Sequence, residues 1–239
     1  MATAKRAPAA KRRLPRGARE RAGIVVERLT SEYPVAHTEL EWSDPFQLLT
    51  AVILSAQTTD VQVNSVLPAL FARYPDAAAL AGAHQDDVEA IVKPTGFYHV
   101  KARSIIEMAQ DVLRVHGGEV PGSMEQLVTL RGVGRKTANV VLGVAFDVPG
   151  FAVDTHVQRL TQLLKLTSAT DPVKIEEDVT SIVAPAEWTG LSLRLILHGR
   201  RVCVARRPRC DACVLVDICP SAFYWLKPAE RAAARVQPR

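Results

Sequence analysis

LRGVGRKT, residues 130–137, joins two segments with helical periodicity through a turn that contains two glycines. Gly132 and Gly134 allow the backbone to adopt a positive φ and to come close to a ligand. The helix that follows begins at Arg135, and its free N–H groups and its dipole favour a bound anion. A plain helical hairpin with a glycine C-cap is the alternative. Because basic residues follow the paired glycines at once, we interpret the turn as a phosphate-binding hairpin.

Two residues near this hairpin have the chemistry of a catalytic pair. Lys136 lies at the start of the second helix, where the helix dipole and partial burial disfavour an ammonium, so we expect its pKa to be lowered. A neutral lysine amine can form a Schiff base with an aldehyde-level carbon. Asp154 is a helix N-cap, and its carboxylate can also stabilise a positive charge on a substrate. A solvated surface lysine is the alternative for Lys136, and position alone favours it.

Helical periodicity extends along almost the whole chain, and few segments read as strands. Asp44-Pro45 and Ser123 are N-cap signals for two of the helices. Short helices with short connections predict an all-α fold. No apolar run approaches the length of a membrane span. The predicted helices are residues 23–31, 46–56, 64–74, 85–92, 101–115, 123–130, 135–146, 155–166, 173–183 and 191–202.

The composition and the charge distribution limit the possible classes of protein. The chain has 239 residues, of which 48% are hydrophobic and 23% charged, which excludes wholesale disorder and collagen-like repeats. Residues 1–21 carry a net charge of +7, whereas the remaining 218 residues carry −2. Such an arm binds phosphates or anionic lipid. A solubilising disordered terminus and an organelle transit peptide are the alternatives.

All four cysteines lie within the last 37 residues of the chain. Their spacing, C-x6-C-x2-C-x5-C, supplies four thiolates for Zn²⁺ or for a [4Fe-4S] cluster. Two disulfides closing such small loops would add little to a chain that can already build a core. Zinc sites usually pair two C-x2-C motifs, and only one is present here. The spacing therefore favours an iron–sulfur cluster and leaves zinc open at Cys203, Cys210, Cys213 and Cys219.

Five motifs, which follow one another along the chain in the order typical of the family, resemble the endonuclease III family of helix-hairpin-helix DNA glycosylases. The resemblance covers roughly residues 20–225. It implies a bifunctional DNA glycosylase and abasic-site lyase of base excision repair that removes oxidised pyrimidines and carries a [4Fe-4S] cluster. The motifs are the glycine hairpin with Lys136, the four-cysteine spacing, Val153-Asp154-Thr155-His156, Leu54-Ser55-Ala56-Gln57-Thr58-Thr59-Asp60 and Leu197-His198-Gly199-Arg200.

The resemblance also implies two helical domains with a DNA cleft between them. Residues 37–150 would form a six-helix barrel with the hairpin, and residues 21–36 and 151–225 a second domain with the cysteine loop. Residues 1–20 would be a basic disordered tail and residues 226–239 a C-terminal tail. We expect a cytoplasmic monomer on the nucleoid, with double-stranded DNA that holds damaged bases or abasic sites as its partner and with no membrane contact.

The resemblance assigns roles to individual residues. Lys136 would attack C1′ of the flipped nucleotide, and Asp154 would stabilise the sugar cation. Gln57 would fill the gap in the stack, and Phe97 stands where the family usually has an intercalating leucine. Without the family, Gln57 reads as a helix cap and Phe97 as a buried loop anchor. The DNA contacts are assigned to Gln57, Phe97, Gly132, Gly134, Arg135, Thr137, Ser55, Asp60 and His156, although packing is favoured for His156.

Three residues depart from the family pattern and leave the lesion preference open. They are Phe97, His99 in place of an asparagine, and Arg131 in place of a proline. A monofunctional mismatch glycosylase is one alternative function, but such relatives lack the nucleophilic lysine at the position of Lys136. A DNA-binding paralogue with low activity is another.

Overall fold

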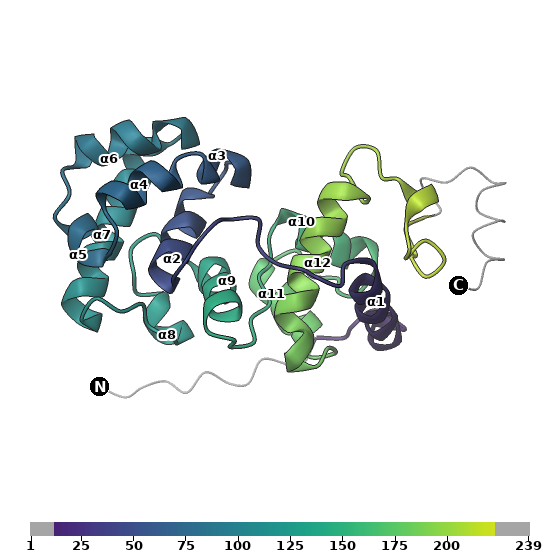
Figure 1. The fold of residues 1–239 in the computed structure, drawn as a ribbon. Coiled ribbons are helices and arrows are strands. Elements are labelled where there is room, and N and C mark those ends of the chain that lie inside the picture. Colours follow the sequence, from purple (N-terminus) through teal and green to yellow (C-terminus); the bar gives the residue numbers. More distant parts are fainter. Residues whose placement is uncertain (1–11, 223–239) are drawn as a thin grey trace, which may run out of the picture.

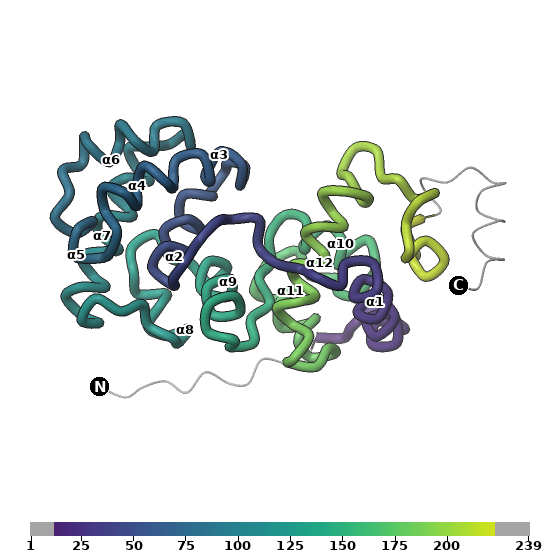
Figure 2. Tube along the Cα trace, viewed as in Figure 1, coloured from purple at the N-terminus to yellow at the C-terminus, as the bar shows by residue number. Residues whose placement is uncertain are grey.

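The computed structural model describes residues 12–222 as helices joined by short loops, with no strand in that range. The predicted all-α fold is therefore confirmed. Two lobes lie side by side (Figure 1). The tube in Figure 2 shows that the chain enters the second lobe, crosses to build the first, and returns to complete the second. Residues 1–11 and 223–239 lie outside the described residues, and they include the first part of the predicted basic tail 1–20 and all of the predicted C-terminal tail 226–239. Residues 18–20, which were expected in the disordered tail, are instead the first residues of a helix.

Twelve α-helices and three short 3₁₀ turns make up this described part. The first lobe contains α2 (Pro45–Leu54), α3 (Asp60–Asn64), α4 (Leu67–Arg73), α5 (Ala77–Ala81), α6 (Gln85–Val92), η1 (Lys93–Thr95), α7 (Tyr98–His116), α8 (Met124–Leu127) and α9 (Arg135–Ala145). The second lobe contains α1 (Ala18–Glu32), α10 (Thr155–Leu163), α11 (Pro172–Thr180), η2 (Pro185–Glu187), α12 (Trp188–Arg201) and η3 (Cys210–Ala212). None of the helices in residues 12–222 has the length and apolarity that a membrane span requires.

Local capping accounts for several helix boundaries. Asp44 Oδ1 accepts a hydrogen bond from the backbone N–H of Gln47 at 2.9 Å, and Ser123 caps α8, as predicted. The predicted helix 64–74 corresponds to α4, which begins three residues later, whereas the sequence pattern gave no sign of α3 before it. Pro68 fits only the first turn of a helix, and α4 therefore starts anew beside it. The sequence analysis also missed α5, which Asp76 caps.

Each lobe has its own hydrophobic core. In the first lobe, α2 is buried at every residue from Leu48 to Leu54 and packs against α7 and α9. In the second lobe, Leu29 of α1 and Leu195 of α12 are fully buried around Phe151. Because the two cores are separate, the residues that join the lobes decide how one lobe lies against the other.

The segment 147–154 returns the chain from the first lobe to the second and is bonded to both. Asn139 of α9 donates from its amide to the carbonyl of Phe151 at 3.3 Å. From α12, Thr189 Oγ1 both accepts from the N–H of Gly150 and donates to its carbonyl, each at 3.2 Å. Ser192 Oγ donates to the carbonyl of Ala152 at 2.8 Å. This segment ends at Asp154, so its bonds position that carboxylate.

We predict that Gly150→Ala destabilises the protein by about 1–3 kcal/mol, because the new methyl forces overpacking. A Cβ at this position would lie 2.6 Å from the backbone oxygen of Asn139, and neither group can move without shifting backbone. Gly23→Ala, in the exposed middle of α1 where a Cβ meets nothing within 4 Å, is the matched control. It should stabilise by about 0.5–1 kcal/mol. Urea unfolding followed by circular dichroism measures both changes, and equal effects at the two glycines would contradict the prediction.

Candidate functional site

A narrow groove of about 80 Å³ between the two lobes brings the predicted catalytic pair together. Lys136 reaches it from the start of α9 in the first lobe, and Asp154 from the start of α10 in the second. Ser55, Asp60 and Arg200 line the same groove. The structure therefore places a lysine amine and a carboxylate from different lobes at one site.

The two central residues differ in how firmly they are held. Asp154 is half-buried and caps α10, with Oδ1 accepting from the backbone N–H of Val157 at 2.8 Å. The cap was predicted, and it fixes the direction of the carboxylate. Lys136, in contrast, is exposed. The expected loss of hydration around its amine is therefore absent from the free protein.

The glycine hairpin leaves room for a ligand at the start of α9. Gly132 has φ +75°, in the left-handed region, and a Cβ there would lie 3.1 Å from Ser104 Cβ. Gly134 has φ −95°, so the expected positive φ applies to Gly132 alone. A Cβ on Gly134 would meet nothing within 4 Å, and no side chain caps α9. The N–H groups of the first turn are thus open to an anion from outside.

Arg135 has a different partner from the phosphate that the sequence suggested. Its Nε and Nη2 donate to the two carboxylate oxygens of Glu176 in α11, each at 2.8 Å. This hydrogen-bonded pair raises the pKa of Arg135. Arg135 therefore joins α9 to the second lobe, and the open N–H groups are left as the anion-binding part of the hairpin. Thr137 is half-buried within the first turn of α9.

Gln57 and Phe97 lie on turns with strained backbone. Both have positive φ, +57° and +50°, although neither is glycine, and both are exposed. Such strain persists where the surrounding structure enforces it, often at functional sites. Phe97 is 66% exposed, so the buried-anchor interpretation is wrong. Thr59, which accepts from Gln62 N at 3.3 Å, caps α3, so Gln57 is not the cap.

The other residues singled out by the sequence have local partners. His99 Nδ1 lies 2.6 Å from a carboxylate oxygen of Glu89. Arg131 Nε lies 3.1 Å from a carboxylate oxygen of Glu107. His156 is half-buried, and burial lowers its pKa. A Cβ on Gly199 would lie 2.8 Å from its Nδ1, so His156 packs against α12, as the sequence analysis favoured.

Arg200 bridges the lobes on the groove wall. It lies near the end of α12 and donates from Nη1 to Asp60 Oδ2 at 2.9 Å, at the start of α3. It also pairs with Glu39, on the segment that connects α1 to α2. Asp60, which the resemblance assigns to the DNA contacts, is thus paired with an arginine of the other lobe. The sequence gave no sign of Glu39, because an acid in a loop has no distinguishing pattern.

The four cysteines lie together and form no disulfide. Burial raises the pKa of the Cys213 thiol to about 12, and the nearness of the other three cysteines adds to the rise. Burial also raises the pKa of Cys210 to about 11, and the nearby Cys203, Cys219 and Asp211 add to that rise. Four crowded thiols are therefore hard to ionise unless a cationic group binds them. The backbone N–H of Leu215 lies 3.4 Å from Cys213 Sγ, and Nε2 of the buried His198 lies 3.3 Å from it.

The arrangement of these thiols fits an iron–sulfur cluster better than a single zinc ion. Within residues 12–222, no three His, Cys, Asp or Glu side chains converge closely enough to hold one metal ion. A tetrahedral zinc requires such convergence, whereas a [4Fe-4S] cluster spreads its four cysteine ligands over separate irons. Arg159 also lies beside Cys203, donating to its carbonyl at 2.7 Å, and its charge opposes the rise in the pKa of that thiol.

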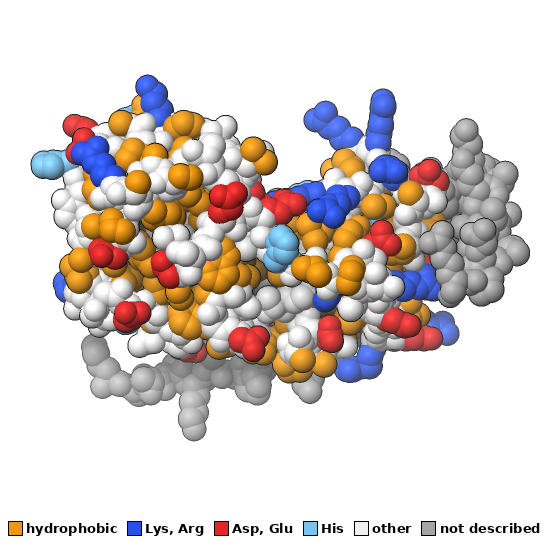
Figure 3. All heavy atoms as spheres, viewed as in Figure 1, with side chains coloured by type: hydrophobic (Ala, Val, Ile, Leu, Met, Phe, Trp, Pro, Cys, Tyr) orange, Lys and Arg blue, Asp and Glu red, His pale blue; other side chains and the backbone are white. Residues whose placement is uncertain are grey.

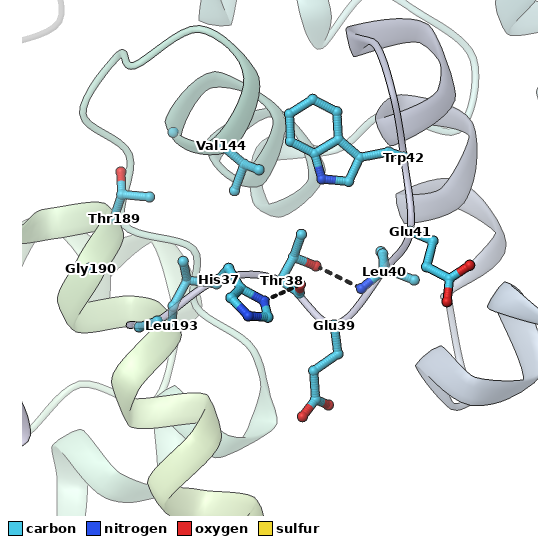
Figure 4. A pocket seen from close by; sticks show the side chains of 12 residues that line it. His37, Thr38, Glu39, Leu40, Glu41, Trp42, Val144, Thr189, Gly190 and Leu193 are labelled. Atoms are coloured by element: carbon cyan, nitrogen blue, oxygen red, sulfur yellow. Dashed lines mark hydrogen bonds between the residues drawn. The ribbon is translucent and has the colours of Figure 1, made fainter. Parts of the chain in front are cut away.

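A second hollow of about 640 Å³ is lined by the connecting segment 36–42 together with residues of α9 and α12 (Figure 4). Glu39 and Glu41 line it together with Trp42, and no lysine or arginine does. A polyanion would be repelled there. Figure 3 shows basic and acidic side chains together at the notch between the lobes, and further basic side chains that project from the second lobe beside it. Arg206, Arg207 and Arg209, in the loop after α12, are all exposed.

Comparison with known proteins agrees with this geometry. Residues 50–185 match the HhH-GPD superfamily of base excision DNA repair proteins, and residues 203–219 match the iron–sulfur binding domain of endonuclease III. Endonuclease III of Synechocystis is 48% identical over 85% of this chain and 94% of its own. The chain belongs to the endonuclease III family. Endonuclease III of Escherichia coli is 42% identical over 82% of this chain and 92% of its own.

Solved endonuclease III structures share the fold. A structure of a non-covalent endonuclease III–DNA complex matches 86% of this chain and 97% of that chain, with a TM-score of 0.83 and 36% identity. A thymine-DNA glycosylase with the same fold is only 20% identical. Membership of the endonuclease III family makes this protein an enzyme of base excision repair, and its four-cysteine loop the site of a [4Fe-4S] cluster.

The purified protein should contain about four irons per chain and be yellow-brown, because Cys203, Cys210, Cys213 and Cys219 supply the ligand set of a [4Fe-4S] cluster. Iron and sulfide analysis, with the visible absorption spectrum, measures this directly. A colourless protein with one zinc per chain would contradict the prediction.

Proposed function

We propose that the protein is a bifunctional DNA glycosylase and abasic-site lyase that removes oxidised pyrimidines from double-stranded DNA, acting as a monomer. The observation that supports this proposal most strongly is the shared groove of Lys136 and Asp154. A monofunctional glycosylase needs only a carboxylate and a water molecule. A lysine amine facing that carboxylate provides in addition the nucleophile for a lyase.

The chemistry follows from these two side chains. In its neutral form, Lys136 Nζ attacks C1′ as the glycosidic bond breaks and the base departs, and the Asp154 carboxylate stabilises the positive charge on the sugar. Opening of the sugar ring gives a Schiff base, which acidifies the C2′ protons. Loss of one such proton expels the 3′ phosphate by β-elimination, and hydrolysis frees the amine. Because Lys136 is exposed in the free protein, the DNA that covers the groove supplies the desolvation that favours a neutral amine.

The damaged nucleotide must leave the stack before C1′ can be reached. Gln57 and Phe97 are suited to occupying the gap, because both are exposed on turns of the first lobe. The two turns lie near each other, since α3, which follows Gln57, packs against η1, which precedes Phe97. An aromatic ring at Phe97 adds stacking area that leucine lacks.

Phosphate binding in this proposal comes from two sides of the groove. The open N–H groups at the start of α9 lie on the first lobe. The exposed Arg206, Arg207 and Arg209 lie on the second, in the loop that the cluster holds. A duplex bound across the notch would contact both sides and leave the acidic hollow at Glu39 and Glu41 uncovered.

Borohydride should trap a covalent complex between the protein and duplex DNA with an abasic site, and Lys136→Ala should abolish it, because Lys136 is the one lysine among residues 12–222 that lines the groove. Gel separation of the trapped complex is the measurement. Lys174→Ala, which removes an exposed lysine of α11 outside the groove, is the matched control and should trap normally.

A second variant separates the two roles of Asp154. Asp154→Asn keeps an N-cap side chain but removes the charge, so it should slow base release about 10²–10³-fold while the fold is retained. Trapping that survives in Lys136→Ala would remove Lys136 as the nucleophile. Excision without any trapping by the unmodified protein would favour the monofunctional alternative, and neither activity would favour a DNA-binding paralogue.

Deleting residues 1–11 should flatten the salt dependence of DNA binding by about 0.9 in slope for each phosphate that the arm neutralises. The deletion stops before Arg12, which is bonded to Asp178 at 2.9 Å, and before α1, so both cores stay intact. Replacing the basic residues of the deleted arm by serine at full length is the control for chain length. An unchanged slope would show that the arm takes no part in binding.

A further inference from the structure

Lys101 is a buried lysine with a single side-chain hydrogen bond. It lies in the first turn of α7 and is only 5% exposed. Its ammonium donates to the backbone carbonyl of Thr95 at 2.7 Å, and Thr95 is itself 2% exposed. Burial lowers the pKa of Lys101, and no carboxylate among residues 12–222 pairs with it.

Lys101 is bonded to both ends of the turn that presents Phe97. Its side chain holds the carbonyl of Thr95, and its backbone N–H donates to the carbonyl of Phe97 at 3.1 Å. Gly96 lies between these two anchors with φ +67°, and Phe97 follows with φ +50°. The hydroxyl of Thr95 adds a bond to the carbonyl of Val92 at 2.8 Å. Two successive residues with positive φ, of which Phe97 is in the left-handed helical region, are therefore enclosed between bonds from one lysine.

An apolar side chain would fill this position with a smaller loss of hydration free energy. A buried, unpaired ammonium loses hydration that one carbonyl does not replace, so it does not serve stability alone. The bond instead fixes a backbone that would otherwise relax from its strained conformation. The residue whose position that rigidity fixes is Phe97, which is 66% exposed.

We propose that Lys101 is a positioning residue for base extrusion: its ammonium holds the turn 95–97 so that the Phe97 ring enters the DNA stack without prior ordering of the loop. This inference rests on the proposed function, in which Phe97 fills the gap. A preorganised turn avoids the entropy of ordering the loop on binding. Without the bond to Thr95, the ring would sample other positions and insertion would be less favourable.

A double-mutant cycle tests this role. Lys101→Met keeps the length of the side chain and removes the donor and the charge. Affinity for duplex DNA with a stable abasic-site analogue should fall about tenfold for Lys101→Met and for Phe97→Ala, and the double variant should show little further loss, because both changes remove the same insertion. Trapping of single-stranded abasic DNA, which has no stack to enter, should remain at the unmodified level.

Lys93→Met is the matched control, because it removes an exposed lysine from η1, directly before the turn 95–97. Any loss that it causes should add to the loss from Phe97→Ala. If Lys101→Met shows no cooperative transition in a thermal melt, the same double-mutant cycle is measured with Lys101→Gln, which keeps a shorter hydrogen-bond donor.

Additive losses at Lys101 and Phe97 would overturn the inference. Equal losses of activity on duplex and on single-stranded DNA would overturn it too, because Lys101 would then act through the fold as a whole. Unfolding of both Lys101→Met and Lys101→Gln would have the same meaning. Failure of the proposed function is distinguishable, since the unmodified protein would then trap neither substrate.

Discussion

The site depends on the bonds that hold segment 147–154 between the lobes. Asn139 from α9 and Thr189 from α12 bond to neighbouring residues of this segment, so neither lobe can shift without breaking a contact. Asp154 follows directly and is fixed again by its own cap on α10. Because the two lobes have separate cores, these polar contacts, together with the Arg135–Glu176 and Arg200–Asp60 pairs, help to hold Lys136 and Asp154 at one groove.

The two halves of the proposed reaction site are prepared to different extents. The carboxylate of Asp154 is fixed before DNA arrives, whereas Lys136 is exposed. In the proposed mechanism this difference restricts the reaction to a bound nucleotide, because an amine that loses water only under that nucleotide reacts only there. The turns at Gln57 and Phe97 belong to the prepared part, since their strained backbones are already in place.

Electrostatics and shape divide the surface by function. The hollow of about 640 Å³ beside Trp42 is far larger than the groove of about 80 Å³, yet acids line it and it lacks basic side chains. The smaller groove has the lysine, the carboxylates and a bridging arginine. The proposed chemistry therefore belongs to the smaller groove, where the two lobes bring charged groups together, and not to the larger hollow.

Periodicity, capping and ligand spacing are local properties, so the sequence was enough to predict the all-α fold, most helix positions, the caps at Asp44, Ser123 and Asp154, and the four-cysteine loop. The sequence pattern gave no sign of α3, and it started α4 three residues early because Pro68 fits only the first turn of a helix. The exposure of Lys136, the pairing of Arg135 with Glu176 and the burial of Lys101 beneath its turn emerged from the folded arrangement alone. Each of these depends on which distant residue lies opposite, and a linear pattern does not contain that information.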